Sequence, residues 1–482
     1  MANRLPLELW TQIAGYLEKD VDSFPKYARI CRHAQSAFEP RIYSTVSVRS
    51  EDFEMRKGIM TLTQFNDLTS GTATSRRALI RWLNYTIIIP YELEDYRAVK
   101  LENETYSEEN PIREANDLAF RASIVSLFQT LSSWGEETRG ITLTINVIGR
   151  QQVLEPGTKE GENLMQSESV PNGEQWVVSP YRARFPEDDA SMLPRISCVE
   201  ELIYEEYFNF WPGAALQVAA HCDSLNHLRL FVEEPVRPDH LTYLRSRHQA
   251  IASALATLPP SIKEFDLWGY RDTPCANFLP SGSTGDELSL NLRDLSLNLR
   301  ELKLSYTPVA LDFLFPLDEN ASPTPQASSL HWPYLEAIRM DAMHNFLPNG
   351  EWLGDRSPRL FEEEEENLPD WQLSRNKLHH EKFHRLFISL GLAARRMPRI
   401  YEISFVIREY SEIDFEFWNS GGSDEKPSMR MRNAGGYKPD ERVAEAWGFA
   451  LEDLEVSQNT EDNDGDHFVE ADVTWSRLPP DA

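Results

Sequence analysis

The sequence predicts an α/β protein in which a short N-terminal helical module precedes a long, irregular β/α solenoid with parallel strands. Residues 1–43 carry apolar side chains at helical spacing. Beyond them, short strand-like phrases recur and alternate with helical patterns, which favours parallel strands joined by crossover helices. We therefore expect a helical module at 1–43, a solenoid at 44–450 and an acidic C-terminal segment at 451–482.

The composition is that of a globular protein. The chain has 482 residues, of which 41% are hydrophobic and 26% charged, and this length suits two to four domains. No apolar run approaches the roughly 20 residues that span a bilayer. The cysteines are far apart and form no CxxC pair, which argues against a disulfide framework and a cysteine zinc site. We expect a soluble protein of a reducing compartment, the cytoplasm or the nucleus.

The net charge narrows the classes of partner. Asp and Glu total 77 against 48 Lys and Arg, which gives −29 at pH 7. Such a surface repels phosphate backbones and anionic lipid, so we expect neither nucleic acid nor a membrane as partner. A partner with a basic patch would be attracted, although much of this charge is expected to serve solubility.

The N-terminal residues predict three short helical elements. Pro6 suits the first turn of a helix, and Leu9, Ile13 and Leu17 recur at four-residue steps. Ser23 suits the cap of a second helix. The inward side of that helix is predicted to be Tyr27, Ile30, Cys31 and Ala34, and a third short element over 39–43 leads into a strand at 44–48.

This N-terminal pattern resembles an F-box, the helical module that docks a protein onto the Skp adaptor of a cullin ubiquitin ligase. The Leu5-Pro6 pair and Ile30-Cys31-Arg32 match family motifs, whereas Ala34 and Gln35 stand where the family usually has a tryptophan. The wider arrangement resembles F-box proteins of fungi with an uncharacterised C-terminal region. The alternative is a helical cap over the next domain. The resemblance implies adaptor binding by Leu5, Pro6, Leu9, Ile13, Leu17, Ile30 and Cys31.

A short apolar phrase recurs through the rest of the chain. Its middle residue lies at 202, 228, 265, 302 and 338, with steps of 26, 37, 37 and 36 residues, and a further copy is centred on 403. Each copy resembles the strand of a leucine-rich repeat, although the steps exceed the usual 20–29 residues and Thr307 replaces the usual Asn or Cys. The copies are Val199-x-x-Leu202-x-Tyr204, Leu225-x-x-Leu228-x-Leu230, Ile262-x-x-Phe265-x-Leu267, Leu299-x-x-Leu302-x-Leu304, Leu335-x-x-Ile338-x-Met340 and Ile400-x-x-Ile403-x-Phe405.

Other segments predict the elements between these phrases. Helical periodicity marks 117–134 and 239–258, and β-branched apolar runs mark strands at 82–89 and 141–145. Stretches rich in Pro, Gly, Ser, Asn and acidic residues predict loop inserts. These inserts lie near 151–172, 272–285, 316–329 and 348–370.

One motif suggests metal chemistry. His380-Glu381-Lys382-Phe383-His384 matches HExxH, in which two histidines one helical turn apart hold zinc and the glutamate activates water. The apolar stripe of the surrounding helix places both histidines at its flank, as in an ordinary surface helix. A zinc metallopeptidase is therefore a remote alternative, and we expect no catalytic residue, no metal and no cofactor.

The sequence favours the substrate-recognition subunit of a Skp–cullin–F-box ubiquitin ligase, with an unidentified protein as its target. An F-box-like interaction scaffold without a ligase role is the alternative. Residues that alternate with the core leucines would face the target. The candidates for target binding are Arg229, Phe231, Trp268, Lys303 and Tyr306.

Overall fold

The chain is a mixed α/β protein with N-terminal helices and a long, largely parallel sheet with alternating helices. Its strand order is β13-β14-β12-β11-β10-β9-β8-β7-β6-β5-β4-β3-β1-β2. The computed structural model describes residues 5–17, 23–51, 59–90, 111–135, 138, 140–149, 182–185, 190–204, 210–232, 241–269, 277–279, 285–343, 346–353, 379–407, 413–419, 426–433, 437–458 and 467–473. It divides into two compact units, Met1–Arg229 and Leu230–Ala482.

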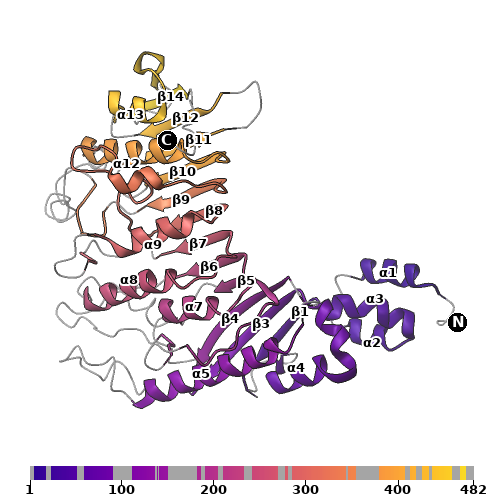
Figure 1. Cartoon of the computed structure of the whole chain (residues 1–482). Helices are drawn as coiled ribbons and strands as arrows, with labels where there is room; N and C mark the ends of the chain where they lie inside the picture. The colour runs from indigo at the N-terminus through magenta and orange to yellow at the C-terminus, as the bar shows by residue number, and fades with distance from the viewer. Residues whose placement is uncertain are drawn as a thin grey trace, which may run out of the picture. The chain divides into compact units, whose positions relative to one another are not determined.

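The first unit begins with three helices and continues into parallel strands (Figure 1). Strands β1, β2, β3, β4 and β5 pair in parallel, and β3 matches β4 from Trp82↔Thr142 to Ile89↔Gly149. The elements are α1 (Leu7–Tyr16), α2 (Phe24–Ala28), α3 (Arg32–Ile42), β1 (Thr45–Arg49), β2 (Met60–Thr61), α4 (Leu62–Thr69), η3 (Gly71–Leu79), β3 (Trp82–Ile89), α5 (Pro111–Ser132), β4 (Ile141–Gly149), β5 (Val199–Tyr204), α7 (Pro212–Ala219) and β6 (His227–Phe231), which reaches two residues beyond the boundary of the unit.

Alternation of side chains explains how β3 packs. Leu83, Tyr85 and Ile87 are fully buried, while the residues between them are half-buried. The hydroxyl of Tyr85 donates a hydrogen bond to the Ser123 carbonyl of α5 at 3.0 Å. One face of this strand is therefore held against the helix.

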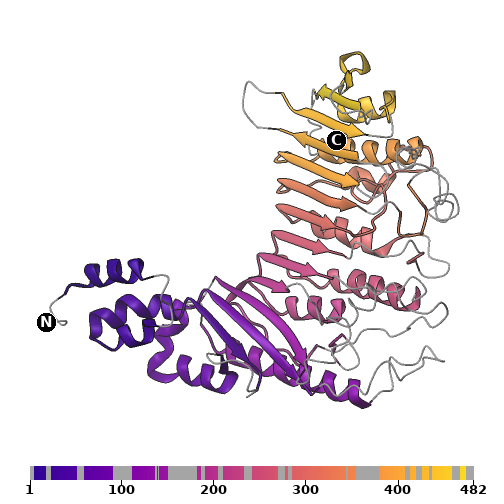
Figure 2. The same ribbon diagram turned by 180° about the vertical axis from the view of Figure 1, so that it is seen from behind.

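The second unit begins with parallel strands and ends with antiparallel strands. Strands β7, β8, β9 and β10 are parallel, whereas β11, β12, β14 and β13 continue in antiparallel pairs. Figures 1 and 2 show α8, α9 and α12 along one side of β7–β10. The elements are α8 (Leu241–Leu255), β7 (Glu264–Trp268), α9 (Glu287–Ser296), β8 (Glu301–Ser305), η7 (Pro325–Ser329), β9 (Ala337–Met343), α12 (His380–Ala394), β10 (Glu402–Ile407), β11 (Ile413–Trp418), β12 (Ser428–Asn433), α13 (Glu441–Trp447), η9 (Leu451–Asp453), β13 (Glu455–Gln458) and β14 (His467–Asp472).

The recurring phrases of the sequence coincide with strands in register. Phe265 pairs with Leu302, Leu302 with Ile338, and Ile338 with Ile403. All four side chains are buried. The prediction of parallel strands is confirmed, because the middle residues of successive phrases form one apolar row.

Two predictions for local structure differ from the observed elements. The predicted second helix ends at Ala28, and the third helix is longer than predicted because it begins at Arg32. The reason is Cys31, which is extended and accepts a hydrogen bond from the Ala34 N–H at its Sγ. The acidic C-terminal segment contains β13 and β14, whose pairing with distant strands has no local sequence signature.

The predicted inserts fall partly outside the described residues. The insert at 316–329 is described and consists of turns with η7. All of 151–172 and most of 272–285 and 348–370 lie outside the described part. Within the described part, no helix is both long and apolar enough to cross a bilayer.

An aromatic cluster forms the core at α12 and α13. Phe387 lies 5.6 Å from Phe405 and 5.1 Å from Phe415, measured between ring centroids. The Trp447 indole N–H donates to the Phe387 carbonyl at 2.9 Å. Gly391 allows this approach, since a Cβ there would lie 2.8 Å from Trp447 Cδ1.

We predict that Gly391→Ala destabilises the protein by about 1–3 kcal/mol, because the added methyl overpacks a buried interface. Urea unfolding measures the change. The control is Gly285→Ala, where a Cβ would have no atom within 4 Å. Equal stability of the two variants would contradict this description of the α12–α13 core.

Candidate functional site

The N-terminal module has an apolar core of its own. Phe38 is fully buried, and its ring centroid lies 5.4 Å from that of Phe24, 5.5 Å from that of Tyr27 and 6.5 Å from that of Trp10. Ala14, Ala34 and Ala37 complete this core. The core therefore takes one side of α1 and does not need all of its apolar residues.

Helix α1 carries two apolar stripes. Trp10, Ala14 and Leu17 share the inward stripe, at the i, i+4, i+7 spacing of one helix face. Leu9, Ile13 and Tyr16 have the same spacing one residue earlier, and Leu9 and Tyr16 are 42% and 90% exposed. The two stripes lie about 100° apart around the helix, because successive residues are separated by that angle. Together they form one wide apolar face, of which the core covers only one part, so the stripe of Leu9 and Tyr16, called the outward stripe, is a candidate docking surface.

The predicted adaptor-binding residues divide between these two environments. Pro6, Leu9 and Ile30 are exposed, the last by 44%. Leu5, Ile13, Leu17 and Cys31 are half-buried and pack against the module's core. The His33 ring Nδ1 is hydrogen-bonded to the Leu5 carbonyl at 3.0 Å, which fixes Leu5 beside α3. Sequence reasoning missed Leu7 and assigned Tyr16 no role, although helical spacing from Leu9 indicates Tyr16.

The predicted target-binding residues lie in a second surface, the aromatic row. Phe231 stacks on Trp268 with 5.6 Å between ring centroids, and Tyr306 lies 5.9 Å from Trp268 on its other side. Lys303 Nζ lies 5.7 Å from the centroid of the Trp268 ring. The structure thus brings these four residues together. Arg229 is half-buried in β6, two residues before Phe231, at the end of the other unit.

Ion pairs continue on the same face of the strands. Lys303 Nζ lies 2.8 Å from Asp341, and Arg339 forms ion pairs with Glu301 and Glu402. The hydrogen bonds that Arg339 donates to Glu402 raise the pKa of Arg339 above its ordinary value. Sequence reasoning missed Arg339 and Asp341, although the alternation that selects Lys303 would also select them. This face is charged and aromatic, while the opposite face is apolar.

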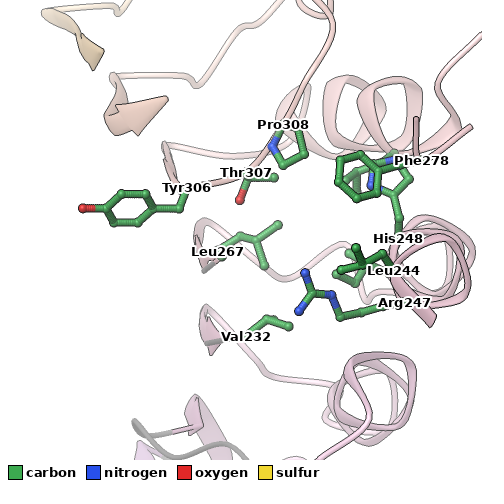
Figure 3. Close-up of a pocket in the computed structure, with 12 residues that line it drawn as sticks. Val232, Leu244, Arg247, His248, Leu267, Phe278, Tyr306, Thr307 and Pro308 are labelled. Atoms are coloured by element: carbon green, nitrogen blue, oxygen red, sulfur yellow. The ribbon is translucent and has the colours of Figure 1, made fainter. Parts of the chain in front are cut away.

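The backbone at the end of β8 positions the Tyr306 ring. Tyr306 has φ of 50°, in the left-handed region that is uncommon for a bulky residue. Gly269 donates its N–H to the Ser305 carbonyl at 2.7 Å, and a Cβ at Gly269 would lie 2.1 Å from the Tyr306 carbonyl oxygen. Figure 3 shows the Tyr306 ring directed away from the helix residues, and its centroid lies 5.9 Å from that of Trp268.

A small cavity lies on the helix side of these strand ends. Figure 3 shows the Arg247 guanidinium pointing between α8 and the strand residues Val232 and Leu267. The cavity volume is about 40 Å³. That is room for a few water molecules and far below the 300–1,000 Å³ or so of a typical ligand site. The cavity that the described residues form is therefore too small for a typical ligand.

A buried histidine–carboxylate pair stabilises the wall of this cavity. His248 Nε2 lies 2.7 Å from Asp286 Oδ1, and Asp286 also accepts the N–H groups of Leu288 and Ser289 at the start of α9. Burial alone would raise the pKa of Asp286. The hydrogen bond and charge of His248 and the hydrogen bonds that Ser289 donates have the opposite effect, and together they lower the pKa of Asp286 below 3.8. The pair is explained by helix capping.

The HExxH residues are engaged in contacts between α12 and α13. Both Glu381 oxygens accept hydrogen bonds from Arg442 at 3.0 Å, so this carboxylate is not directed at a water between the histidines. His384 is buried, its Nε2 lies 3.4 Å from Asp440, and its ring packs edge-on against Tyr437. Among the described residues, no three His, Cys, Asp or Glu are grouped so that they could hold a metal ion.

Comparison of the chain with protein-family models, curated proteins and solved structures found no match in any of the three.

We predict that Gly269→Ala lowers the free energy of unfolding by about 2 kcal/mol or more. The new methyl would meet the backbone at Tyr306, which cannot move aside as a flexible side chain can. Thermal and urea unfolding check this. A variant as stable as wild type would show that the strand ends are looser than described.

His384 predicts a pH dependence of stability. Burial lowers its pKa from 6.5, and Arg442 adds to this while Asp440 opposes it. The unfolded chain then binds a proton more readily, so stability present above about pH 6.5 is lost as pH falls through the folded pKa. We expect the loss between about pH 7 and pH 5 to be smaller in His384→Gln. Parallel stability curves of the variant and wild type would exclude this role.

Proposed function

We propose that the chain is a substrate-recognition subunit of a Skp–cullin–F-box ubiquitin ligase. In this proposal the N-terminal module docks on the Skp adaptor, and the β/α strands form an irregular leucine-rich-repeat-like solenoid that binds a target protein. The chain itself contributes no catalytic residue. It acts by raising the effective concentration of the target near the ubiquitin-loading partner.

The outward stripe of α1 is the observation that carries the proposal. The module closes its own core around Phe38 and still leaves Leu9 and Tyr16 exposed. Burying an apolar side chain stabilises by about 1.5–3 kcal/mol relative to leaving it exposed. A partner helix or groove over Leu9 and Tyr16 would recover this energy, as adaptor docking does in the family that the motif resembles.

The position of the missing tryptophan fits this proposal. Ala34 is fully buried as part of the core, and a tryptophan there would not fit without rearranging that core. Gln35 is exposed and hydrogen-bonded to Glu39 at 2.9 Å. The departure therefore changes one outward residue and leaves the stripe of α1 intact.

The strand register supports the repeat assignment, because Phe265, Leu302, Ile338 and Ile403 pair in one row. Thr307 stands where leucine-rich repeats usually carry Asn or Cys, and its hydroxyl donates to the Ser305 carbonyl of its own strand at 3.1 Å. The aromatic row of Phe231, Trp268 and Tyr306 is then the proposed target-binding surface, since aromatic residues often anchor protein interfaces.

We predict that the wild-type chain captures the Skp adaptor in a pull-down and that Leu9→Asp reduces binding at least about tenfold, because it places a charge in the apolar contact. The matched control is Thr11→Asp, an exposed position off the stripe on the same helix. We expect it to bind within about twofold of wild type, since it lies outside the contact.

Two outcomes of the pull-down would contradict the proposal. If wild type does not bind the adaptor, the receptor function fails. If the adaptor binds but no cullin co-purifies with it, the alternative of an interaction scaffold without a ligase role is supported. Circular dichroism of both variants shows whether the helices remain folded.

A further inference from the structure

A cluster of cations lies where the parallel strands β7–β10 begin, that is, along the N-terminal ends of these strands. This cationic edge is separate from the surfaces described above. Lys263 and Arg300 directly precede β7 and β8, and Arg399 lies shortly before β10. The backbone ties these positions together: Arg300 N–H donates to the Lys263 carbonyl at 2.6 Å, and Glu336 N–H to the Arg300 carbonyl at 2.7 Å. The parallel strands therefore bring cations that are distant in sequence to one edge.

Tyr334 is the aromatic centre of this cationic edge. Its side chain is 46% exposed. Lys263 Nζ lies 5.8 Å from the centroid of its ring, and Arg399 Cζ lies 5.7 Å from the same centroid. Both distances are within the range of a cation–π contact. The ring thus stands between two positive charges and remains open to solvent.

None of the three cations forms an ion pair with a carboxylate of the described residues. Lys263 Nζ contacts the backbone carbonyls of Pro260 and Asn298 at 3.4 and 3.5 Å, and the Arg300 and Arg399 side chains are exposed. Glu336, which lies between Arg300 and Arg399 along the cationic edge, forms no ion pair with any of the three cations. By contrast, Lys303, Arg339, Arg385 and Arg442 of the same unit each form an ion pair with a described carboxylate.

We propose that this cationic edge binds an acidic segment of a partner protein. Carboxylates of the segment would pair with Arg300 and Arg399, and an aliphatic or aromatic side chain would cover Tyr334. The edge from β7 to β10 covers three strand spacings, about 14 Å, which matches about four residues of extended peptide. Polyphosphate would pair with the cations but would leave the exposed Tyr334 ring uncovered, so a peptide segment fits this edge better.

This proposal concerns a different surface from the adaptor contact, and its test contains no adaptor, so the two can fail separately. The probe is a fluorescently labelled hexaglutamate peptide, whose anisotropy is measured with the full chain at about 0.1 M ionic strength, where charges about 10 Å apart still interact. We expect binding that weakens with added salt.

The double variant Arg300→Gln/Arg399→Gln should reduce affinity for the peptide at least about tenfold, since it removes two charge-assisted contacts. The matched control is Arg430→Gln, which neutralises an exposed arginine already paired with Glu470 at 3.0 Å. Its affinity should stay within about twofold of wild type.

Three results would overturn the proposal. The first is no binding of the peptide by wild type, and the second is equal loss of affinity in the double variant and the control. The third is tighter binding of a single-stranded oligonucleotide of equal charge, which would assign the edge to nucleic acid. Circular dichroism confirms that the exposed substitutions leave the fold intact.

Discussion

The structure depends on one constraint, the burial of alternate strand side chains beneath helices. In β7–β10 the row Phe265, Leu302, Ile338 and Ile403 lies in register and is buried. Successive side chains of a strand point to opposite faces. The remaining positions therefore form a second face, on which Trp268, Lys303 and Arg339 are held by stacking and ion pairs. The helix-covered row stabilises the fold, and the second face is the surface that we propose for target binding.

The N-terminal module is limited in a different way, because its small core can bury only a few apolar side chains. Phe38 gathers Trp10, Phe24 and Tyr27 around it. This core takes up one stripe of α1 and leaves the stripe of Leu9 exposed. The proposed division of labour follows from this difference: the module offers an apolar contact, while the strands offer aromatic rings and charges.

Much of the fold follows from local patterns in the sequence. The apolar phrases and the β-branched runs coincide with parallel strands. They can be recognised in the sequence because a strand that is buried on one face has an apolar residue at every second position. The break at Cys31 and the antiparallel strands β11–β14 were not predictable in this way. The break depends on the cap that the Cys31 sulfur provides to the Ala34 N–H, and the antiparallel strands depend on pairing between distant segments. For the site, alternation along the strands selects Trp268 and Lys303. The sorting of α1 into inward and outward stripes needs Phe38, which only the fold brings to Trp10.

The central claim is that the outward stripe of α1 is a docking surface for the Skp adaptor. Hydrogen–deuterium exchange of the full chain with and without the adaptor tests it most directly, because it locates the contact without altering any residue. We predict increased protection in α1 and at Ile30, with exchange in β7–β10 unchanged. Protection confined to the strands, or no change in α1 at saturating adaptor, would contradict the account.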